Sequence, residues 1–404
     1  MFESIFIGTS GLIGFSKSLR VISNNLANVN TPGFKGSQLQ FADFFYQNGG
    51  THAQNFASGG GSGSAQYGAG LNTLGSQIDF RPGTPQSSSN GTDVAINGNG
   101  FFILRDGNQQ YFTRSGQFVP DSEGFLVSRT NGFRVQVLGA NGKLSDFSVS
   151  DLQYNPGKAT TAVKFDGGIA ADAASTSATA SFDFFEASGL THPTTLSFTK
   201  NTTPAPGATS TWTATVIGTG AALGIPNTIS FDSSGNILPS SSKLTLTYSI
   251  NAMVQTAELD FSAAKLLSAG STPLRFKSQD GFTAGILSQS STFDADGQFQ
   301  AKYSNNQTIK GAVLALARFD SDQDIQQAGG SLFTSTNAAN VEFGRAGTGL
   351  FGKISAGSIE GSNVDLAQEF SNLIVAQRGY QASSRVISTA NELVQELFDM
   401  KGRN

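Results

Sequence analysis

The stretch from residue 362 to residue 404 carries the clearest hydrophobic periodicity of the chain. Apolar residues recur there every seven positions, and one more follows four residues after the first of them. The row is Leu366, Phe370, Leu373, Tyr380, Ile387 and Val394. This spacing predicts one long amphipathic helix with a stripe of the coiled-coil kind. Positions 364 to 400 would span roughly 55 Å as a helix, so the stripe needs a partner along its length.

The N-terminal stretch shows a second apolar row with the same spacing. Its members are Ile5, Leu12, Phe15, Leu19, Ile22 and Leu26. Two such rows predict that residues 1–30 and 360–404 form one helical assembly domain. Gly8, Gly11 and Gly14 interrupt the first helix, and each costs about 1 kcal/mol relative to alanine. Two interpretations stay open: a self-contained two-helix stalk, or helices that order on assembly because small residues pack closely against neighbouring copies.

Between the helices the pattern changes to short alternating runs that are typical of strands. Residues 31–70 are expected to form an extended connector, rich in Gly and Ser from residue 59 onward. Residues 71–151 and 279–359 are expected to form a first β-domain, interrupted by a second one at 152–278 that is richer in Ala, Ser and Thr. The predicted fold class is α+β and multidomain, with terminal helices in a coiled-coil-like domain and two mainly antiparallel β-domains nested between them.

Turn signals divide the predicted strands. Asn97-Gly98-Asn99-Gly100 contains two turn dipeptides and predicts a tight reversal between its flanking strands. An Asp-x-x-Gly element recurs at Asp121, Asp232 and Asp294, and it predicts type I turns that close hairpins. Calcium binding is the alternative at Asp294, but the loop lacks the further acidic ligands of a calcium loop. The start of the C-terminal helix is expected at Ser362, which forms a capping-box-like pair with Asp365.

Composition removes several classes of function. Charged residues make up 13% of the chain and the net charge is -4, which leaves no basic surface for nucleic acid. We expect no membrane insertion and no cleaved signal peptide, because no run of about 20 apolar residues and no basic start with a cleavage site are evident. The chain contains no cysteine, which excludes disulfides and thiol chemistry.

Catalytic patterns are scarce. His52 and His192 supply neither a triad nor a metal set, and both are expected at the surface. The run from Gly347 to Gly352 matches a dinucleotide pattern in letters but lacks its following helix and acidic residue, so a loop is the better interpretation. We therefore predict no catalytic residue, no cofactor and no metal, and the chain is not expected to be an enzyme. A secreted glycosidase has no support beyond the presence of carboxylates.

Several motifs resemble those of the flagellar rod and hook proteins of bacteria. The N-terminal run resembles their Asn-Asn-Leu-Ala-Asn and Thr-Pro-Gly-Phe-Lys signature, the strand region resembles their Ile-x-Gly-x-Gly-Phe-Phe pattern, and the last helix resembles their Ser-Asn-Val and Gln-Arg-x-Tyr motif. The matching residues are Asn24, Asn25, Asn28, Gly33, Phe34, Gly98, Gly100, Ser362, Asn363, Gln377 and Arg378. Ile359 stands where leucine is usual. The resemblance covers both termini and the first β-domain, somewhat over half of the chain.

The resemblance implies a structural subunit of a tubular homopolymer, with terminal helices along the inner wall and β-domains outward. It implies export through the flagellar type III apparatus, a place outside the cell in the basal body and hook, and contacts with the distal rod protein, the hook cap and the hook-filament junction proteins. The second β-domain is typical of hook subunits, which form a flexible universal joint between rod and filament. The alternatives are a distal rod subunit of the same family and, with less support, a secreted adhesin-like β protein.

Overall fold

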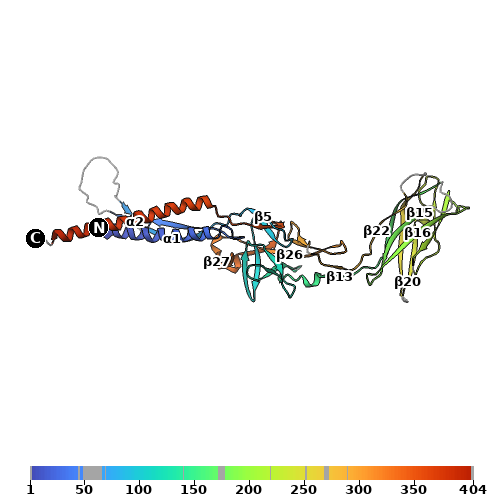
Figure 1. Ribbon diagram of the computed structural model, residues 1–404, viewed down its shortest axis with the longest axis horizontal. Coiled ribbons are helices and arrows are strands. Elements are labelled where there is room, and N and C mark those ends of the chain that lie inside the picture. Colours follow the sequence, from blue (N-terminus) through green and yellow to red (C-terminus); the bar gives the residue numbers. More distant parts are fainter. Residues whose placement is uncertain are drawn as a thin grey trace. The chain divides into compact units, whose positions relative to one another are not determined.

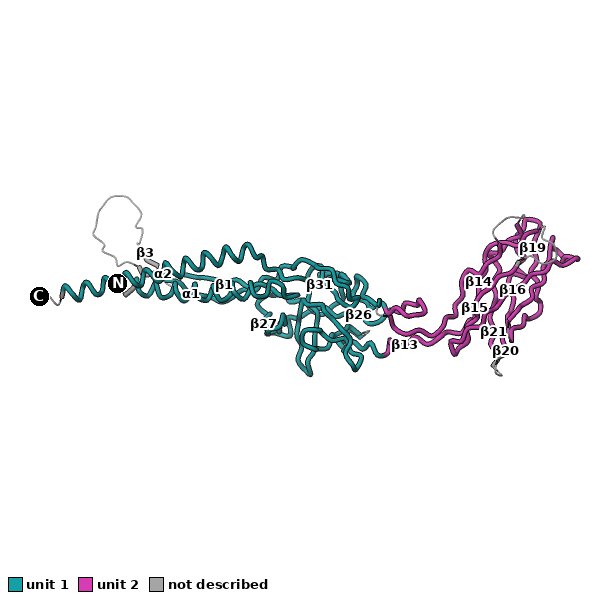
Figure 2. Tube along the Cα trace, in the orientation of Figure 1, with its two compact units in different colours: residues 1–150, 290–300, 310–404 teal, residues 151–289, 301–309 magenta. Residues whose placement is uncertain are grey.

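The computed structural model describes residues 2–43, 46–48, 66–68, 70–139, 141–171, 178–218, 220–250, 253–267, 273–288 and 290–401. These residues are mostly β, with one long helix near each end of the chain (Figure 1). Residues 1–150, 290–300 and 310–404 form one compact unit, and residues 151–289 and 301–309 form a second (Figure 2). His52, Arg403 and most of the Gly/Ser-rich stretch 59–70 lie outside the described residues.

In unit 1, helices α1 (Phe2–Ala27) and α2 (Leu366–Lys401) pack side by side and antiparallel (Figure 1). The start of α2 corrects the sequence prediction. The Asp365 carboxylate accepts hydrogen bonds from the amides of Ala367 and Gln368 at 2.8 and 3.2 Å, so Asp365 caps the helix. Ser362 lies three residues earlier and its hydroxyl accepts from the amide of Val364, before the helix begins.

Helix α1 also differs from expectation. From Ser4 to Ala27 it is long and apolar enough to cross a membrane by length and composition, although we expected no such run. Core helices of soluble proteins and signal sequences near an N-terminus share this length and composition. At the end of the helix the Asn28 side-chain amide donates to the Asn24 carbonyl at 2.9 Å, and the same carbonyl also accepts the Asn28 backbone amide at 3.3 Å.

A β-hairpin packs against α1. It pairs β1 (Ser37–Asp43) with β4 (Leu71–Ile78), and β2 (Tyr46–Asn48) with β3 (Gln66–Gly68). Gly14 of α1 faces it so closely that an added Cβ would lie 2.7 Å from Cδ2 of Leu71. Part of the stretch that we expected to be an extended connector is therefore paired strand.

The main sheet of unit 1 has twelve strands. They are β7 (Phe101–Asp106), β8 (Gln109–Thr113), β9 (Phe118–Pro120), β10 (Leu126–Ser128), β11 (Arg134–Leu138), β12 (Leu144–Asp146), β24 (Thr292–Phe293), β25 (Gln298–Lys302), β26 (Thr308–Phe319), β27 (Ile325–Gly329), β28 (Leu332–Ser335) and β29 (Val341–Arg345). Its longest path runs β24-β25-β26-β11-β7-β8-β28-β27. Aromatic side chains fill the interior: Phe101 contacts Phe80, Phe319 and Phe333 at centroid distances of 5.5 to 5.7 Å.

Two small sheets complete unit 1, and one of them corrects a turn prediction. They pair β6 (Val94–Asn97) with β30 (Lys353–Ala356), and β5 (Pro85–Ser87) with β31 (Ser358–Glu360). Because β6 pairs with β30 whereas β7 belongs to the main sheet, residues 97–100 do not close a hairpin. The glycines serve a close approach instead: an added Cβ on Gly98 would lie 3.0 Å from Cα of Gly352, whose amide donates to the Asn99 carbonyl at 2.8 Å.

The three Asp-x-x-Gly turns are confirmed. In each, the glycine amide donates to the carbonyl of the first residue and the aspartate Oδ1 accepts two further amides at 2.7 to 3.0 Å. The fourth-position glycines have φ between 76° and 83°, a conformation that favours glycine. The turns at Asp121 and Asp294 join β9 to β10 and β24 to β25. The aspartate side chains thus accept hydrogen bonds from the backbone amides of their own turns.

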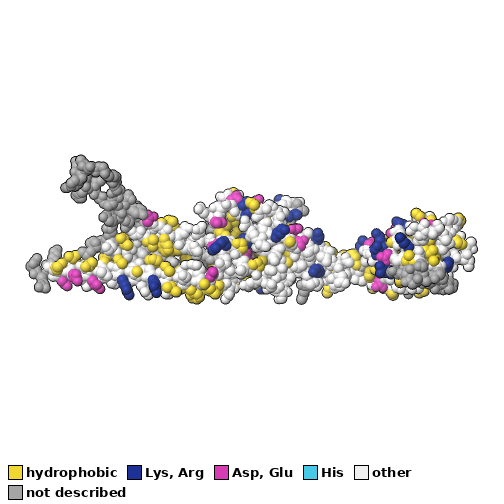
Figure 3. All heavy atoms as spheres, turned by 90° about the horizontal axis from the view of Figure 1, so that it is seen from above, with side chains coloured by type: hydrophobic (Ala, Val, Ile, Leu, Met, Phe, Trp, Pro, Cys, Tyr) yellow, Lys and Arg dark blue, Asp and Glu magenta, His cyan; other side chains and the backbone are white. Residues whose placement is uncertain are grey.

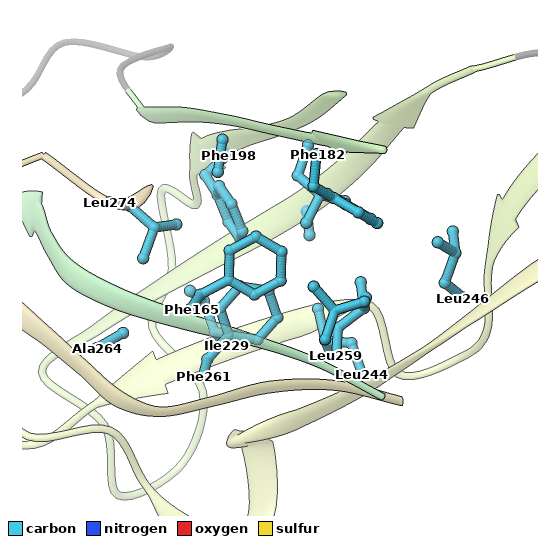
Figure 4. Packing of buried hydrophobic residues seen from close by; sticks show 14 of the residues in the cluster. Phe165, Phe182, Phe198, Ile229, Leu244, Leu246, Leu259, Phe261, Ala264 and Leu274 are labelled. Carbon is cyan, nitrogen blue, oxygen red and sulfur yellow. The ribbon is translucent and has the colours of Figure 1, made fainter. Parts of the chain in front are cut away.

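Unit 2 contains two larger sheets. One has the order β18-β20-β21-β14-β22 and the other β15-β16-β17-β19. Their strands are β14 (Ala162–Ala170), β15 (Ala178–Phe185), β16 (Thr191–Lys200), β17 (Ser210–Ile217), β18 (Ala221–Leu223), β19 (Thr228–Phe231), β20 (Lys243–Ile250), β21 (Met253–Leu267) and β22 (Arg275–Gln279), and a short pair joins β13 (Tyr154–Asn155) to β23 (Gly285–Ile286). Phe165, Phe182, Phe198 and Phe261 meet between the sheets in one buried cluster (Figure 4).

Four 3-10 helices occur in the described chain, at Ser150–Leu152, Pro239–Ser241, Asp322–Asp324 and Ala338–Asn340.

Candidate assembly surface

Small residues bring α1 and α2 into close contact. A Cβ added to Gly8 would lie 2.7 Å from Cγ1 of Ile387, and one added to Gly11 would lie 2.7 Å from Oγ of Ser383. A Cβ added to Gly379 of α2 would lie about as close to the ring of Phe15. Close packing of the α1 glycines against neighbouring copies is one of the two interpretations that the sequence allows. In the structure they pack within the chain: the lack of a side chain at Gly8 and Gly11 sets the separation of the two helices, whereas Gly14 faces the β1–β4 hairpin.

The two predicted apolar rows are placed differently. In α1 the row faces the helix contact: Ile22 is buried, and Ile5, Leu12, Phe15, Leu19 and Leu26 are half-buried. In α2 the row straddles the edge of the contact: Leu373, Ile387 and Val394 are half-buried, whereas Leu366, Phe370 and Tyr380 are 42 to 50% exposed. The buried line of α2 runs instead through Ala376 and Ala390, which hydrophobic spacing alone did not single out.

Large apolar side chains remain exposed on both sides of that buried line. Phe370 and Ile374 lie on one side, and Leu393 and Leu397 lie on the other. Figure 3 shows hydrophobic side chains gathered on the part of the surface that the helices form. Large apolar side chains that gather on one part of a protein surface are typical of an interaction site.

Near the end of α1 and the start of α2, a cluster of buried charges connects three segments of unit 1 that are distant in the sequence. Lys35 Nζ donates to Glu360 Oε1 at 2.6 Å and to the Arg81 carbonyl at 2.8 Å, and Arg114 lies 3.4 Å from Glu360 Oε2. These three charged side chains are at most 3% exposed. Burial lowers the pKa of Lys35 and that of Arg114, and the negative charge of Glu360 opposes both shifts. The cluster therefore couples the end of α1 to the strands that precede α2.

Two asparagines connect the same region. Asn25 donates to the Ser37 carbonyl at 2.8 Å and to Glu369 Oε1 at 3.0 Å, and it accepts from the Ser37 amide at 3.0 Å. Asn363 accepts from the Gly36 amide at 2.8 Å and donates to the carbonyls of Asp79 and Arg81. Both side chains thus bond to backbone that begins and ends the β1–β4 hairpin.

The remaining motif residues have more local contacts. Asn24 and Asn28 bond to each other at the end of α1. Gly33 has φ of 69°, and an added Cβ would lie 2.5 Å from the Ser115 amide, so no larger residue fits. Phe34 is half-buried, Gly98 and Gly100 have φ of 115° and 126°, and Gln377 and Arg378 are exposed on α2.

Sequence reasoning missed the charged residues of this site. Lys35, Arg114, Glu360 and Glu369 are buried at 1 to 7% exposure, although charged residues are rarely buried. A signal was present for Lys35, because it ends the Thr-Pro-Gly-Phe-Lys run in a chain with few charges. The pairing of these residues required the fold, since 325 positions separate Lys35 from Glu360.

The residues considered as catalytic candidates have local structural contacts. His192 is half-buried and its Nε2 lies 2.6 Å from Glu186 Oε1, so it belongs to a local pair. Residues 347–352 form the loop between β29 and β30, without a following helix. Among the described residues, no group of three or more His, Cys, Asp or Glu could hold a metal ion.

Comparison with known proteins gives three matching family models. "Flagella basal body rod protein" matches residues 5–35, "Flagellar hook protein FlgE/F/G D1 domain" matches residues 95–171, and "Flagellar basal body rod FlgEFG protein C-terminal" matches residues 355–400. The three matches fall on α1, on the first strands of the main sheet and on α2. They include the motif residues described above.

Curated relatives match over nearly the whole length. The chain is 26% identical to flagellar hook protein FlgE of Treponema pallidum, covering 99% of this chain and 100% of the relative. It is 28% identical to that of Borreliella burgdorferi over the same shares, and 28% identical to that of Salmonella typhimurium over 97% and 98%. A crystal structure of Helicobacter pylori flagellar hook protein FlgE2 covers 67% of this chain and 98% of its own at a TM-score of 0.48 and 13% identity. The three family matches and the similarity to hook proteins over nearly the whole length show that the chain belongs to the flagellar rod and hook protein family.

Proposed function

We propose that this chain is the structural subunit that polymerises into the flagellar hook, the flexible tube between rod and filament. The observation that supports assembly through the helices is the exposed apolar surface of the helix pair. Small residues of α2 take up the contact with α1, so Phe370, Ile374, Leu393 and Leu397 remain exposed. Burying them against further copies would remove apolar surface from water at about 25 cal/mol per Å².

The predicted domain plan and partners belong to this proposal. The helices of residues 1–30 and 360–404 form a coiled-coil-like inner layer, and the β-domains of 71–151 with 279–359 and of 152–278 face outward. The distal rod protein, the hook cap and the hook-filament junction proteins are the expected neighbours at the ends of the tube. The flagellar type III apparatus is the expected export route, and the tube stands outside the cell. The subunit carries out no catalysis.

The first test is electron microscopy of the purified chain at high concentration. Tubes of uniform diameter are the expected result, because the exposed apolar rows are satisfied by repeating contacts. A monomer that stays dispersed at every concentration would favour an adhesin-like protein or an enzyme over a hook subunit.

The second test introduces Leu373→Asp in the half-buried part of the α2 row. Losing a buried leucine costs about 2 to 5 kcal/mol, and an unpaired carboxylate adds to that cost, so tubes should be absent. The β-sheets should keep their thermal transitions, and secreted subunit should still appear in the culture medium. Normal tubes would show that residue 373 does not contribute to assembly.

A further inference from the structure

A groove of about 800 Å³ opens between α1, β1 and the first turns of α2. Its apolar walls include Phe15, Ile22, Leu39 and Val375, and the carboxylate of Glu369 lines it as well. The cation on its rim, Arg81, is already engaged, because its guanidinium pairs with Asp79. The groove therefore has both apolar and polar walls, and Glu369 is the buried acid among its lining residues.

In the described part of the chain, only one of the two carboxylate oxygens of Glu369 accepts a hydrogen bond. Glu369 is 7% exposed, and its Oε1 accepts the hydrogen bond from Asn25 at 3.0 Å. Its Oε2 is buried and has no hydrogen-bond partner within the described residues. A buried carboxylate oxygen without a donor is unfavourable, so the groove is complementary to a cation that enters with an apolar surface.

The outer face of α1 carries such a cation. Arg20 is exposed and forms no ion pair within the described residues, and Ile13, two helical turns earlier, is 52% exposed. Ser16 and Ser23 flank Arg20 on the same face and are exposed too. Small neighbours let the guanidinium project into a groove. Arg378 on α2 is instead flanked by the bulkier Ile374 and Val375.

We propose that the groove is a docking site for α1 of a second copy of this chain, with the Arg20 guanidinium of that copy donating to Glu369 Oε2. Ile13 of the second copy lies against the apolar wall. This inference rests on the proposed function, because it specifies one contact within the polymer. It assigns Glu369 and Arg20 as the pair that selects the register between neighbouring subunits, since a shift by one helical turn would separate the charges.

The test is a double-mutant cycle on the full-length chain, read as the critical concentration for tube formation. Glu369→Gln keeps the Oε1 acceptor for Asn25 and replaces Oε2 by an amide, and Arg20→Gln removes the cation. Each single substitution should raise the critical concentration about tenfold, as expected for a lost charge-assisted hydrogen bond. The double variant should be no worse than either single variant, because both remove the same contact.

Arg385→Gln is the matched control, since it removes an exposed arginine from the other helix. The fold-change in critical concentration that Arg385→Gln causes should multiply with the fold-change caused by Glu369→Gln when the two substitutions are combined, because the two residues do not share a contact. Multiplying effects for Arg20→Gln and Glu369→Gln, or no effect of either, would overturn the inference. A wild-type chain that forms no tubes would instead contradict the proposed function. Circular dichroism of each monomeric variant at the wild-type level establishes that the fold is retained.

Discussion

At the scale of single residues, a small cluster of buried charges connects distant segments of unit 1. Lys35 and Arg114 meet Glu360 inside unit 1, so one anion serves two buried cations. Removing one member of a buried ionic cluster leaves an uncompensated charge, which is more costly than losing a surface pair. The stability of unit 1 should therefore depend strongly on Glu360.

We predict that Glu360→Gln lowers the free energy of unfolding of unit 1 by about 3 to 5 kcal/mol. Differential scanning calorimetry should show the unit 1 transition at a lower temperature and the unit 2 transition unchanged. The matched control is Glu342→Gln, which breaks the pair of Arg318 with a carboxylate that is 56% exposed. Its cost should stay below about 1 kcal/mol. Equal costs for the two variants would contradict the structural role of the buried cluster.

A second residue-scale prediction concerns Asp280 in unit 2. Burial raises the pKa of its carboxyl, but hydrogen bonds from Thr161 and Ala162 outweigh that effect and lower the pKa from 3.8 to about 2. The unfolded chain therefore binds the proton first as the pH falls. The contribution is fully present above pH 3.8, lost as the pH approaches 2, and amounts to about 2 kcal/mol. Thermal unfolding of unit 2 between pH 5 and pH 2 measures it, and Asp280→Asn should flatten that part of the profile.

At the scale of elements, the helix pair depends on the absence of side chains at its contact. Gly8 of α1 would cost about 1 kcal/mol relative to alanine in an isolated helix. In the pair it lets Ile387 approach, because an added Cβ would lie 2.7 Å from Cγ1 of Ile387 and 3.3 Å from the Ser383 carbonyl oxygen. Packing therefore outweighs intrinsic helix propensity at this position.

We expect Gly8→Ala to destabilise the helix pair by about 1 to 3 kcal/mol despite the better helix former. The exposed Ser16→Ala should have a neutral or slightly stabilising effect, because only propensity changes there. In an Ile387→Ala background the clashing atom is gone, and Gly8→Ala should no longer destabilise. Helix content and melting temperature by circular dichroism measure all four variants. A stabilising Gly8→Ala in the wild-type background would refute this account of the contact.

The comparison with sequence-based expectation also belongs to this scale. The long helices and the three Asp-x-x-Gly turns were predictable, because periodicity and turn chemistry act over a few residues. The strands on either side of the reversal predicted at residues 97–100 do not pair with each other, and Gly98 instead lies close to Gly352, far away in the chain. The contact line of α2 was missed because Ala376 and Ala390 carry little hydrophobic signal.

At the scale of the molecule, the chain forms two units, and unit 2 has a core of its own. The chain enters and leaves the larger sheets of unit 2 at Thr161 and Asp280, where the Asp280 carboxylate accepts the amides of Thr161 and Ala162 at 2.8 and 2.9 Å. Because these two points are adjacent, the residues between them can be removed without separating the ends.

We predict that replacing residues 162–279 by a short Gly/Ser linker leaves unit 1 folded. Its cooperative thermal transition should stay within a few degrees of the full-length value, and the isolated segment 158–283 should fold by itself. A deletion variant that loses the unit 1 transition would show that the two units do not fold independently. Electron microscopy of the variant then reports whether unit 2 is needed for tube formation.

The arrangement of β14 and β22 has a mechanical consequence. Val163 pairs with Gln279 and Asp166 with Arg275, so the two strands are antiparallel neighbours whose entry and exit points lie at the same end. A force that separates these points acts across the ladder and breaks its hydrogen bonds one after another, like a zipper, instead of loading them together in shear. Unit 2 should thus yield at low force when its two connections are drawn apart, with the β13–β23 pair and the Lys158–Phe282 bridge failing before the contacts of Asp280.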